Sequence, residues 1–146
     1  DFFRPIKIHK VHYEVNGIKK TGYFSFILIS NANRIAGINM FYKDVKLDDN
    51  KFEILLCNFS TRRSIIKTLR LLIDNNPNNI SGLEFYKTNH IKFEFEQYPK
   101  KAWCIDGEKL DRRTKKFEFT TISDFKIMMP NKNVEKLFTK KTNLKN

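Results

Sequence analysis

The residues best suited to chemistry follow a short apolar segment that begins at Trp103. Asp106 and Glu108 stand two positions apart with Gly107 between them, so two carboxylates flank a residue that has no side chain. One such carboxylate can take a proton from a hydroxyl, a pair can hold a metal-bound phosphate, and the glycine lets another group approach closely. Asp-Gly after a strand is also a common turn signature, so a purely structural role is the alternative.

Motifs of other enzyme classes are missing from the 146 residues. The sequence has neither a GxGxxG nor a GxxxxGK[ST] pattern, so it shows no phosphate-cradling loop and no ATP site of its own. His9 and His12 are three apart on an expected strand, where side chains alternate between faces, and His90 stands alone. A zinc site is therefore not indicated.

The elements that must position the two carboxylates are mostly strands. Residues 23–30 form an apolar run typical of a strand covered on both faces, and residues 91–95 alternate as in a half-buried strand. One amphipathic helix is expected at about residues 60–73, and five apolar side chains should pack it against the sheets: Ile65, Ile66, Leu69, Leu72 and Ile73. Asn133 can cap a short basic C-terminal helix. This pattern predicts a mainly β fold, an antiparallel β-sandwich or barrel, of which the sandwich is our prediction.

The composition is that of one basic domain. The chain carries 28 Lys and Arg against 16 Asp and Glu, a formal net charge of +12, and residues 109–146 hold 11 basic against 4 acidic groups. This balance favours an anionic partner, which can be a nucleic acid, a phosphorylated ligand or an anionic membrane surface, although a solvated lysine-rich surface explains it equally well. No apolar run approaches the roughly 18 residues of a membrane span, so we expect a cytoplasmic protein.

Four short motifs occur in one order along the chain. They are Asn31 just after an apolar run, Ala36-Gly37 before Ile38, the acidic stretch at residues 47–53, and Asp106-Gly107-Glu108. With this order and spacing, residues 6–130 resemble the C-terminal domain of the bacterial diacylglycerol kinase and sphingosine kinase-related lipid kinases. The resemblance implies that residues 1–130 form the lipid-acceptor-side domain of an ATP-dependent lipid kinase.

The resemblance also implies parts that these 146 residues do not contain. In the family a nucleotide-binding half with a Gly-Gly-Asp-Gly motif precedes this region, so ATP and its Mg²⁺ would be bound mainly there and the isolated chain would be inactive. Residues 131–146 would form a basic segment that docks back on that half, and the alternatives are that it holds anionic lipid headgroups or is a solvated end. The implied partners are the lipid acceptor and a membrane surface to which the protein attaches peripherally, and a homodimer is compatible with them.

The resemblance assigns roles to the residues of the motifs. Asp106 would face the lipid hydroxyl as general base, at the accessible edge of a cleft, and Glu108 would support it or the nucleotide metal. These roles suit phosphoryl transfer, because that reaction needs little covalent chemistry from the protein. Asn31, Ala36 and Gly37 would line the lipid cleft, where the family has a run of glycines.

A structural divalent-metal loop is implied for the acidic stretch. Its ligands would be the Asp49 carboxylate and the backbone carbonyls of Lys46 and Lys51, hard oxygen ligands that suit magnesium or calcium. The family usually has glycine where this chain has Asn50, but Asn tolerates a positive φ better than most residues, so the turn can persist. The alternative is that the aspartates simply begin a turn.

Two other functions remain open. A small basic β-protein could bind nucleic acid with Phe and Tyr rings as stacking platforms, although aromatic residues that alternate along strands are more often core. A relative that has lost catalysis could persist as a lipid-binding module. DNA affinity that falls steeply with salt would indicate the former, and lipid binding without kinase activity would indicate the latter.

Overall fold

Most strands of the chain belong to two antiparallel sheets. The computed structural model describes residues 5–32, 34–35, 38–39, 45–74, 80–99, 103–110 and 114–123. In chain order the elements are β1 (His9–Val15), β2 (Ile18–Phe24), β3 (Phe26–Ser30), β4 (Arg34–Ile35), β5 (Ile38–Asn39), β6 (Phe52–Cys57), α1 (Arg62–Asp74), β7 (Leu83–Thr88), β8 (His90–Phe95), β9 (Cys104–Ile105), β10 (Glu108–Lys109) and β11 (Lys116–Thr120). The predicted mainly β, antiparallel fold is confirmed, with a single helix in the part described.

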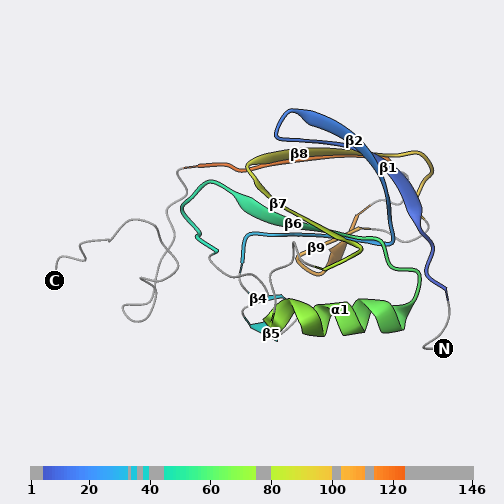
Figure 1. Cartoon of the computed structure of the whole chain (residues 1–146). Coiled ribbons are helices and arrows are strands. Elements are labelled where there is room, and N and C mark those ends of the chain that lie inside the picture. Colours follow the sequence, from blue (N-terminus) through green and yellow to red (C-terminus); the bar gives the residue numbers. More distant parts are fainter. Residues whose placement is uncertain are drawn as a thin grey trace.

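The two sheets are stacked, and the helix covers the outer side of one of them (Figure 1). The four-stranded sheet has the order β11-β8-β1-β2, and the three-stranded sheet has the order β3-β6-β7. Helix α1 runs beneath the three-stranded sheet, on the side away from the four-stranded sheet. Two short hairpins, β4 with β5 and β9 with β10, lie outside these sheets. The architecture is therefore a sandwich with a helix added as a third layer.

Strand β6 is the centre of the fold because all six of its residues are buried. Ile54 and Leu56 belong to the apolar cluster between the sheets, together with rings of the four-stranded sheet such as Phe93. Leu55 and Cys57 alternate to the opposite face and form a second cluster. Fully burying one such aliphatic side chain is worth about 1.5–3 kcal/mol, so this strand contributes strongly to stability.

Helix α1 begins close to where the sequence predicted a helix. Thr61 lies just before it, and its Oγ1 accepts the backbone N–H of Ser64 at 3.2 Å, as an N-cap residue does. Ile65 is half-buried, but Ile66 is 37% exposed. Ile66 is therefore covered less than the expected packing against the sheets requires, and exposed basic residues neighbour it along the helix. Three other predicted packing side chains lie outside the part described: Leu69, Leu72 and Ile73.

The chain passes between the sheets twice, each time across one residue. Ser25 separates β2 from β3, and Asn89 separates β7 from β8. The single strand expected at residues 23–30 is therefore two strands, because the chain bends at Ser25. The backbone N–H of Ser25 donates to the Cys57 carbonyl at 2.8 Å, and its Oγ accepts the N–H of Phe59 at 3.1 Å. These bonds fix the corner to the end of β6, and such strand-switching bends are typical of packed sheets.

Some predictions concern residues that the structure does not describe. The expected basic C-terminal helix and the domain boundary at residue 130 both lie outside the described ranges, which end at residue 123. Within those ranges, no helix combines the length and the apolar character that crossing a bilayer requires.

Candidate functional site

The two predicted catalytic carboxylates lie on the tip of a tight hairpin. Strands β9 and β10 pair antiparallel, with Ile105 opposite Glu108, so only two residues connect them. The connecting residues have positive φ angles, 48° at Asp106 and 91° at Gly107, as a type I′ turn requires. The turn signature in the sequence is therefore a real turn, and the same turn presents both carboxylates to solvent, since Asp106 and Glu108 are exposed.

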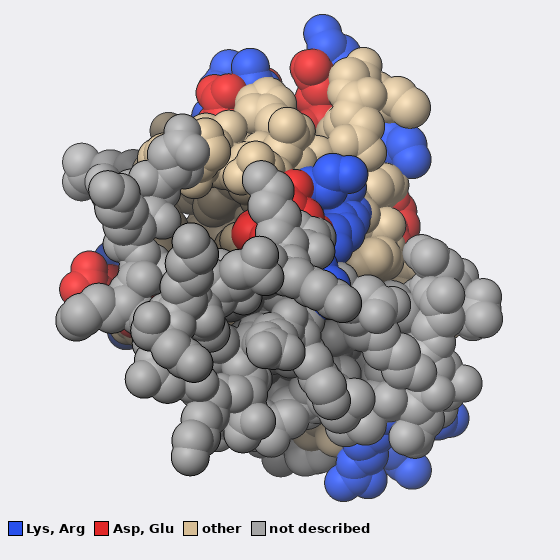
Figure 2. Space-filling view, turned by 90° about the vertical axis from the view of Figure 1, so that its left-hand side faces the viewer, with Lys and Arg blue, Asp and Glu red and all other residues tan. Residues whose placement is uncertain are grey.

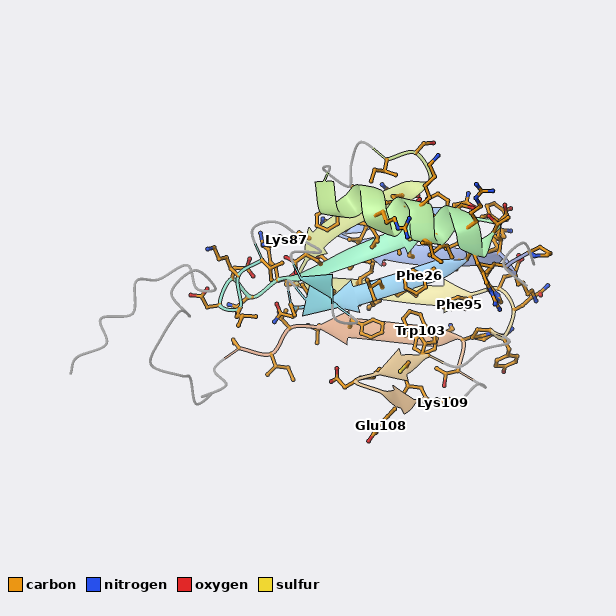
Figure 3. The ribbon with its side chains drawn as sticks, turned by 90° about the horizontal axis from the view of Figure 1, so that it is seen from below. Phe26, Lys87, Phe95, Trp103, Glu108 and Lys109 are labelled. Carbon is orange, nitrogen blue, oxygen red and sulfur yellow. The ribbon has the colours of Figure 1, made fainter. Side chains whose placement is uncertain are left out.

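An aromatic cluster anchors the base of this hairpin. The half-buried Trp103 ring lies 4.7 Å from the Phe117 ring and 5.8 Å from the Phe119 ring, measured between centroids, and it also approaches Phe95 at 6.0 Å. The backbone N–H of Leu110 donates to the Trp103 carbonyl at 2.9 Å, which closes the ladder. Figure 3 shows Trp103 beside Phe95 and Glu108 pointing away from the body. The aromatic cluster thus holds the base of the hairpin in place, and with it the two carboxylates at the tip.

The exposure expected of Asp106 is confirmed, but the groove found in the described part lies elsewhere. This groove, of about 700 Å³, follows the outer face of the four-stranded sheet, and neither hairpin carboxylate lines it. Opposite charges face each other across its strands, as in Lys116–Glu94 at 3.2 Å and Lys92–Glu118 at 3.4 Å. Such exposed pairs largely neutralise each other, so this face is not a concentrated anion-binding surface.

The residues expected to line a lipid cleft are only partly described. Asn31 is exposed just after the end of β3, and the preceding Ser30 fixes the local turn, because its Oγ accepts the backbone N–H of Ala32 at 3.1 Å. Ala36 and Gly37 lie outside the described residues, between β4 and β5. Their assignment to the lipid cleft stays a prediction.

The acidic loop before β6 is organised around a lysine from β7. Asp49 Oδ1 accepts the backbone N–H of Lys51 at 3.0 Å, and Asp49 Oδ2 lies 2.7 Å from the Lys87 ammonium. The same ammonium lies 3.2 Å from Oε1 of Glu53, a residue that is only 1% exposed. Asn50 adopts a φ of 54°, which confirms that asparagine can keep the turn.

Electrostatics in this cluster follow from burial and pairing. Burial raises the pKa of Glu53, and the nearby Lys87 ammonium acts in the opposite direction. Burial lowers the pKa of Lys87, but its hydrogen bonds to Asp49 and Glu53 outweigh that effect, so the pKa of Lys87 is raised. The Lys87 ammonium therefore stays protonated between the carboxylates of Asp49 and Glu53.

This arrangement does not fit the divalent ion that the resemblance implies for the loop. Mg²⁺ and Ca²⁺ require several oxygens at roughly 2.0–2.6 Å, whereas both Asp49 oxygens already accept N–H donors. Within the described ranges, no three His, Cys, Asp or Glu side chains gather into a metal site made of side chains alone. The ligand set of Asp49, Lys46 and Lys51 stays a prediction, and we derive no chemical step through a metal there.

Sequence analysis missed the partnership of Glu53 and Lys87, although a signal was present. Glu53 is the only charged residue within an otherwise apolar strand, 52–57. Lys87 continues the alternation of Leu83 and Phe85 on one face of β7, and it stands directly opposite Glu53 in the register. A carboxylate and a lysine that both fall in apolar positions of neighbouring strands predict a buried ion pair.

No protein-family model matches the chain, and no curated protein sequence matches it significantly. Its fold is similar to solved structures described as "a putative diacylglycerol kinase" from Bacillus anthracis str. Sterne. One is 21% identical with a TM-score of 0.51 and matches 63% of this chain and 32% of its own. Another is 16% identical with a TM-score of 0.55, and the match covers 78% of this chain and 37% of its own.

These likenesses concern the fold. They confirm, at that level, the resemblance to the lipid kinase family that the sequence motifs indicated. The chain spans about a third of the length of the structures that it matches.

Proposed function

We propose that this chain is the lipid-acceptor-side domain of an ATP-dependent lipid kinase that acts on a diacylglycerol-like alcohol. The observation that supports the proposal most directly is the Asp106-Gly107-Glu108 hairpin, exposed and fixed at its base, on a fold shared with part of proteins described as diacylglycerol kinases. ATP and its Mg²⁺ would be bound mainly by a second, nucleotide-binding domain.

In this proposal the chain contributes position and a base. Phosphoryl transfer depends mainly on alignment and on charge stabilisation, so the acceptor domain has little covalent chemistry to perform. The Asp106 carboxylate would accept the proton of the lipid hydroxyl as that oxygen attacks the terminal phosphorus of ATP, whose bond to the bridging oxygen breaks so that ADP leaves. Glu108, on the same hairpin, would orient Asp106 or the nucleotide metal. The tight turn restricts where both carboxylates can lie.

The direct test is a lipid kinase assay with diacylglycerol in detergent micelles. The full-length protein that carries this domain should transfer the terminal phosphate of ATP to the lipid. The isolated 146 residues should not, because they contain no phosphate-cradling motif. A full-length protein that binds lipid vesicles but transfers no phosphate would contradict the kinase proposal and favour the inactive lipid-binding module.

A peripheral membrane contact is part of the proposal, and helix α1 provides the surface that favours it. Its exposed side carries basic residues around the exposed Ile66: Arg62, Arg63, Lys67 and Arg70. The first turn holds no acidic residue, so cations stand at the positive end of the helix dipole, which costs stability. In Figure 2 blue side chains gather at the lower edge, the level at which α1 lies in Figure 1. This surface suits anionic lipid headgroups.

Neutralising this surface should weaken binding to anionic vesicles at least tenfold. We would replace Arg62, Lys67 and Arg70 together by Gln and measure sedimentation with phosphatidylglycerol vesicles at low salt. Each cation near such a surface is worth about 1 kcal/mol, which supports an effect of this size. The matched control replaces Lys19, Lys92 and Lys116 on the outer face of the four-stranded sheet by Gln, an equal change in charge. Equal losses in both variants would show that net charge alone drives binding.

The structure gives less support to nucleic-acid binding. Most rings on the strands of the four-stranded sheet, such as Tyr13, Phe93 and Phe117, are buried between the sheets and cannot serve as stacking platforms, and Tyr23 on β2 is an exposed ring. The outer face of that sheet pairs its lysines with glutamates. Salt-dependent DNA binding that survives both triple substitutions would contradict this assignment.

A further inference from the structure

A charged cluster lies where the acidic loop meets the three-stranded sheet. It consists of Asp49 from the loop, Glu53 from β6 and Lys87 from β7. The Lys87 ammonium lies between the two carboxylates, 2.7 Å from Asp49 and 3.2 Å from Glu53. In Figure 3 Lys87 stands well apart from Glu108, so this cluster and the hairpin are different places on the molecule.

The surroundings of Glu53 make a cation necessary at this point. Its carboxylate is nearly inaccessible, and within the described residues its Oε2 has no hydrogen-bond partner. A buried carboxylate without a counter-charge is strongly unfavourable. Lys87 stands directly opposite Glu53 in the β6–β7 register, so the sheet itself delivers the ammonium.

We propose that the Lys87 ammonium is the resident cation of the acidic loop, in the place that the family resemblance gives to a divalent metal. The loop is then held closed by a side chain of the chain itself. One ammonium bridges the loop and the central strand, and the Asn50 carbonyl adds a second tie by accepting the Thr121 hydroxyl at 3.1 Å. Folding of the loop requires no Mg²⁺ or Ca²⁺.

The direction of the pKa of Lys87 agrees with this role. Burial alone would favour the neutral amine, yet the pairing with Asp49 and Glu53 raises the pKa of Lys87. The bridging group is thus a permanent cation at neutral pH, as a structural metal would be.

The test is the thermal unfolding midpoint of the full chain with EDTA and with about 5 mM MgCl₂ or CaCl₂, a concentration above the dissociation constants of weak calcium sites. In the wild type the midpoint should be the same in all three conditions. Lys87→Ala should lower it by roughly 5 °C or more, because the buried Glu53 and the half-buried Asp49 lose their counter-charge. In Lys87→Ala the divalent ion should then raise the midpoint by about 3 °C or more, since it enters the vacated cation position.

The matched control is Lys92→Ala. It removes a lysine of equal charge from an exposed pair with Glu118, and it should shift the midpoint by less than about 2 °C, with or without metal.

If Lys87→Ala fails to fold, Lys87→Gln keeps most of the side-chain length and an N–H donor while removing the charge, and the same metal comparison applies. Stabilisation of the wild type by Mg²⁺ or Ca²⁺ would overturn the proposal. So would a Lys87 variant that the ions do not rescue. The readout is stability, so its outcome is independent of the kinase proposal.

Discussion

Asp106→Asn in the full-length protein should lower lipid kinase turnover by roughly 100-fold or more, which is the usual contribution of a general base. Asparagine keeps the size of the side chain and, like aspartate, tolerates the φ of 48° found at this position. Asn-Gly is itself a favoured type I′ turn, so the hairpin should remain intact. The substitution therefore removes the base and little else, and the phosphorylation rate of diacylglycerol at saturating ATP measures the loss.

Two further variants define what this result means. Glu108→Gln should reduce turnover less than Asp106→Asn if Glu108 only orients its neighbour, and to a similar extent if it holds the nucleotide metal. Glu94→Gln should leave turnover unchanged, because this carboxylate pairs with Lys116 on the outer face of the four-stranded sheet, in a groove that neither hairpin carboxylate lines. An Asp106→Asn rate within about threefold of wild type would show that the turn has a structural role only.

Trp103→Ala should destabilise the sandwich by about 2 to 3 kcal/mol. Replacing a buried aromatic side chain by alanine costs about 3 to 5 kcal/mol, and the loss should be smaller here because Trp103 is only half-buried. The ring contacts Phe117, Phe119 and Phe95 and closes one end of the core between the sheets. Its loss leaves a cavity at the base of the β9–β10 hairpin. Urea unfolding followed by circular dichroism would measure the change.

The controls for this prediction separate packing from mere size. Trp103→Phe keeps an aromatic ring in the cluster and should lose less than half as much stability. Tyr98→Ala removes a ring that is 56% exposed and should change stability by less than about 1 kcal/mol. If Trp103→Ala and Tyr98→Ala unfold at the same urea concentration, the hairpin is not anchored through Trp103.

Sequence patterns predicted the elements in which burial decides the structure. Phe52–Cys57 is apolar except at Glu53 and forms the buried strand β6, and the alternation at residues 91–95 appears as the alternating burial of β8. Helix α1 was predictable because a capping hydroxyl precedes an amphipathic run. In these segments local pattern and tertiary packing agree, which is the condition under which single-sequence inference succeeds.

Prediction was poorer where partners distant in sequence decide the structure. Strand β2, Ile18–Phe24, is mostly polar and exposed, and it is a strand because it pairs with β1, so hydropathy could not define it. The bend at Ser25 depends on bonds to Cys57 and Phe59, more than thirty residues away. The Lys87 bridge depends in the same way on the register of β7 with β6. Motif spacing located the hairpin carboxylates but not the cation beside Asp49.

The two one-residue corners have a consequence for how the molecule forms. Because Ser25 and Asn89 join strands of one sheet directly to strands of the other, the four-stranded sheet takes β1 and β2 from before the segment that forms the three-stranded sheet and β8 and β11 from after it. Strand β1 must also find β8 across most of the chain. Contacts so distant in sequence require costly loop closure, and domains dominated by them fold in roughly milliseconds to seconds. The four-stranded sheet should therefore form late, after the chain between β2 and β8 has folded back and brought β1 and β8 together.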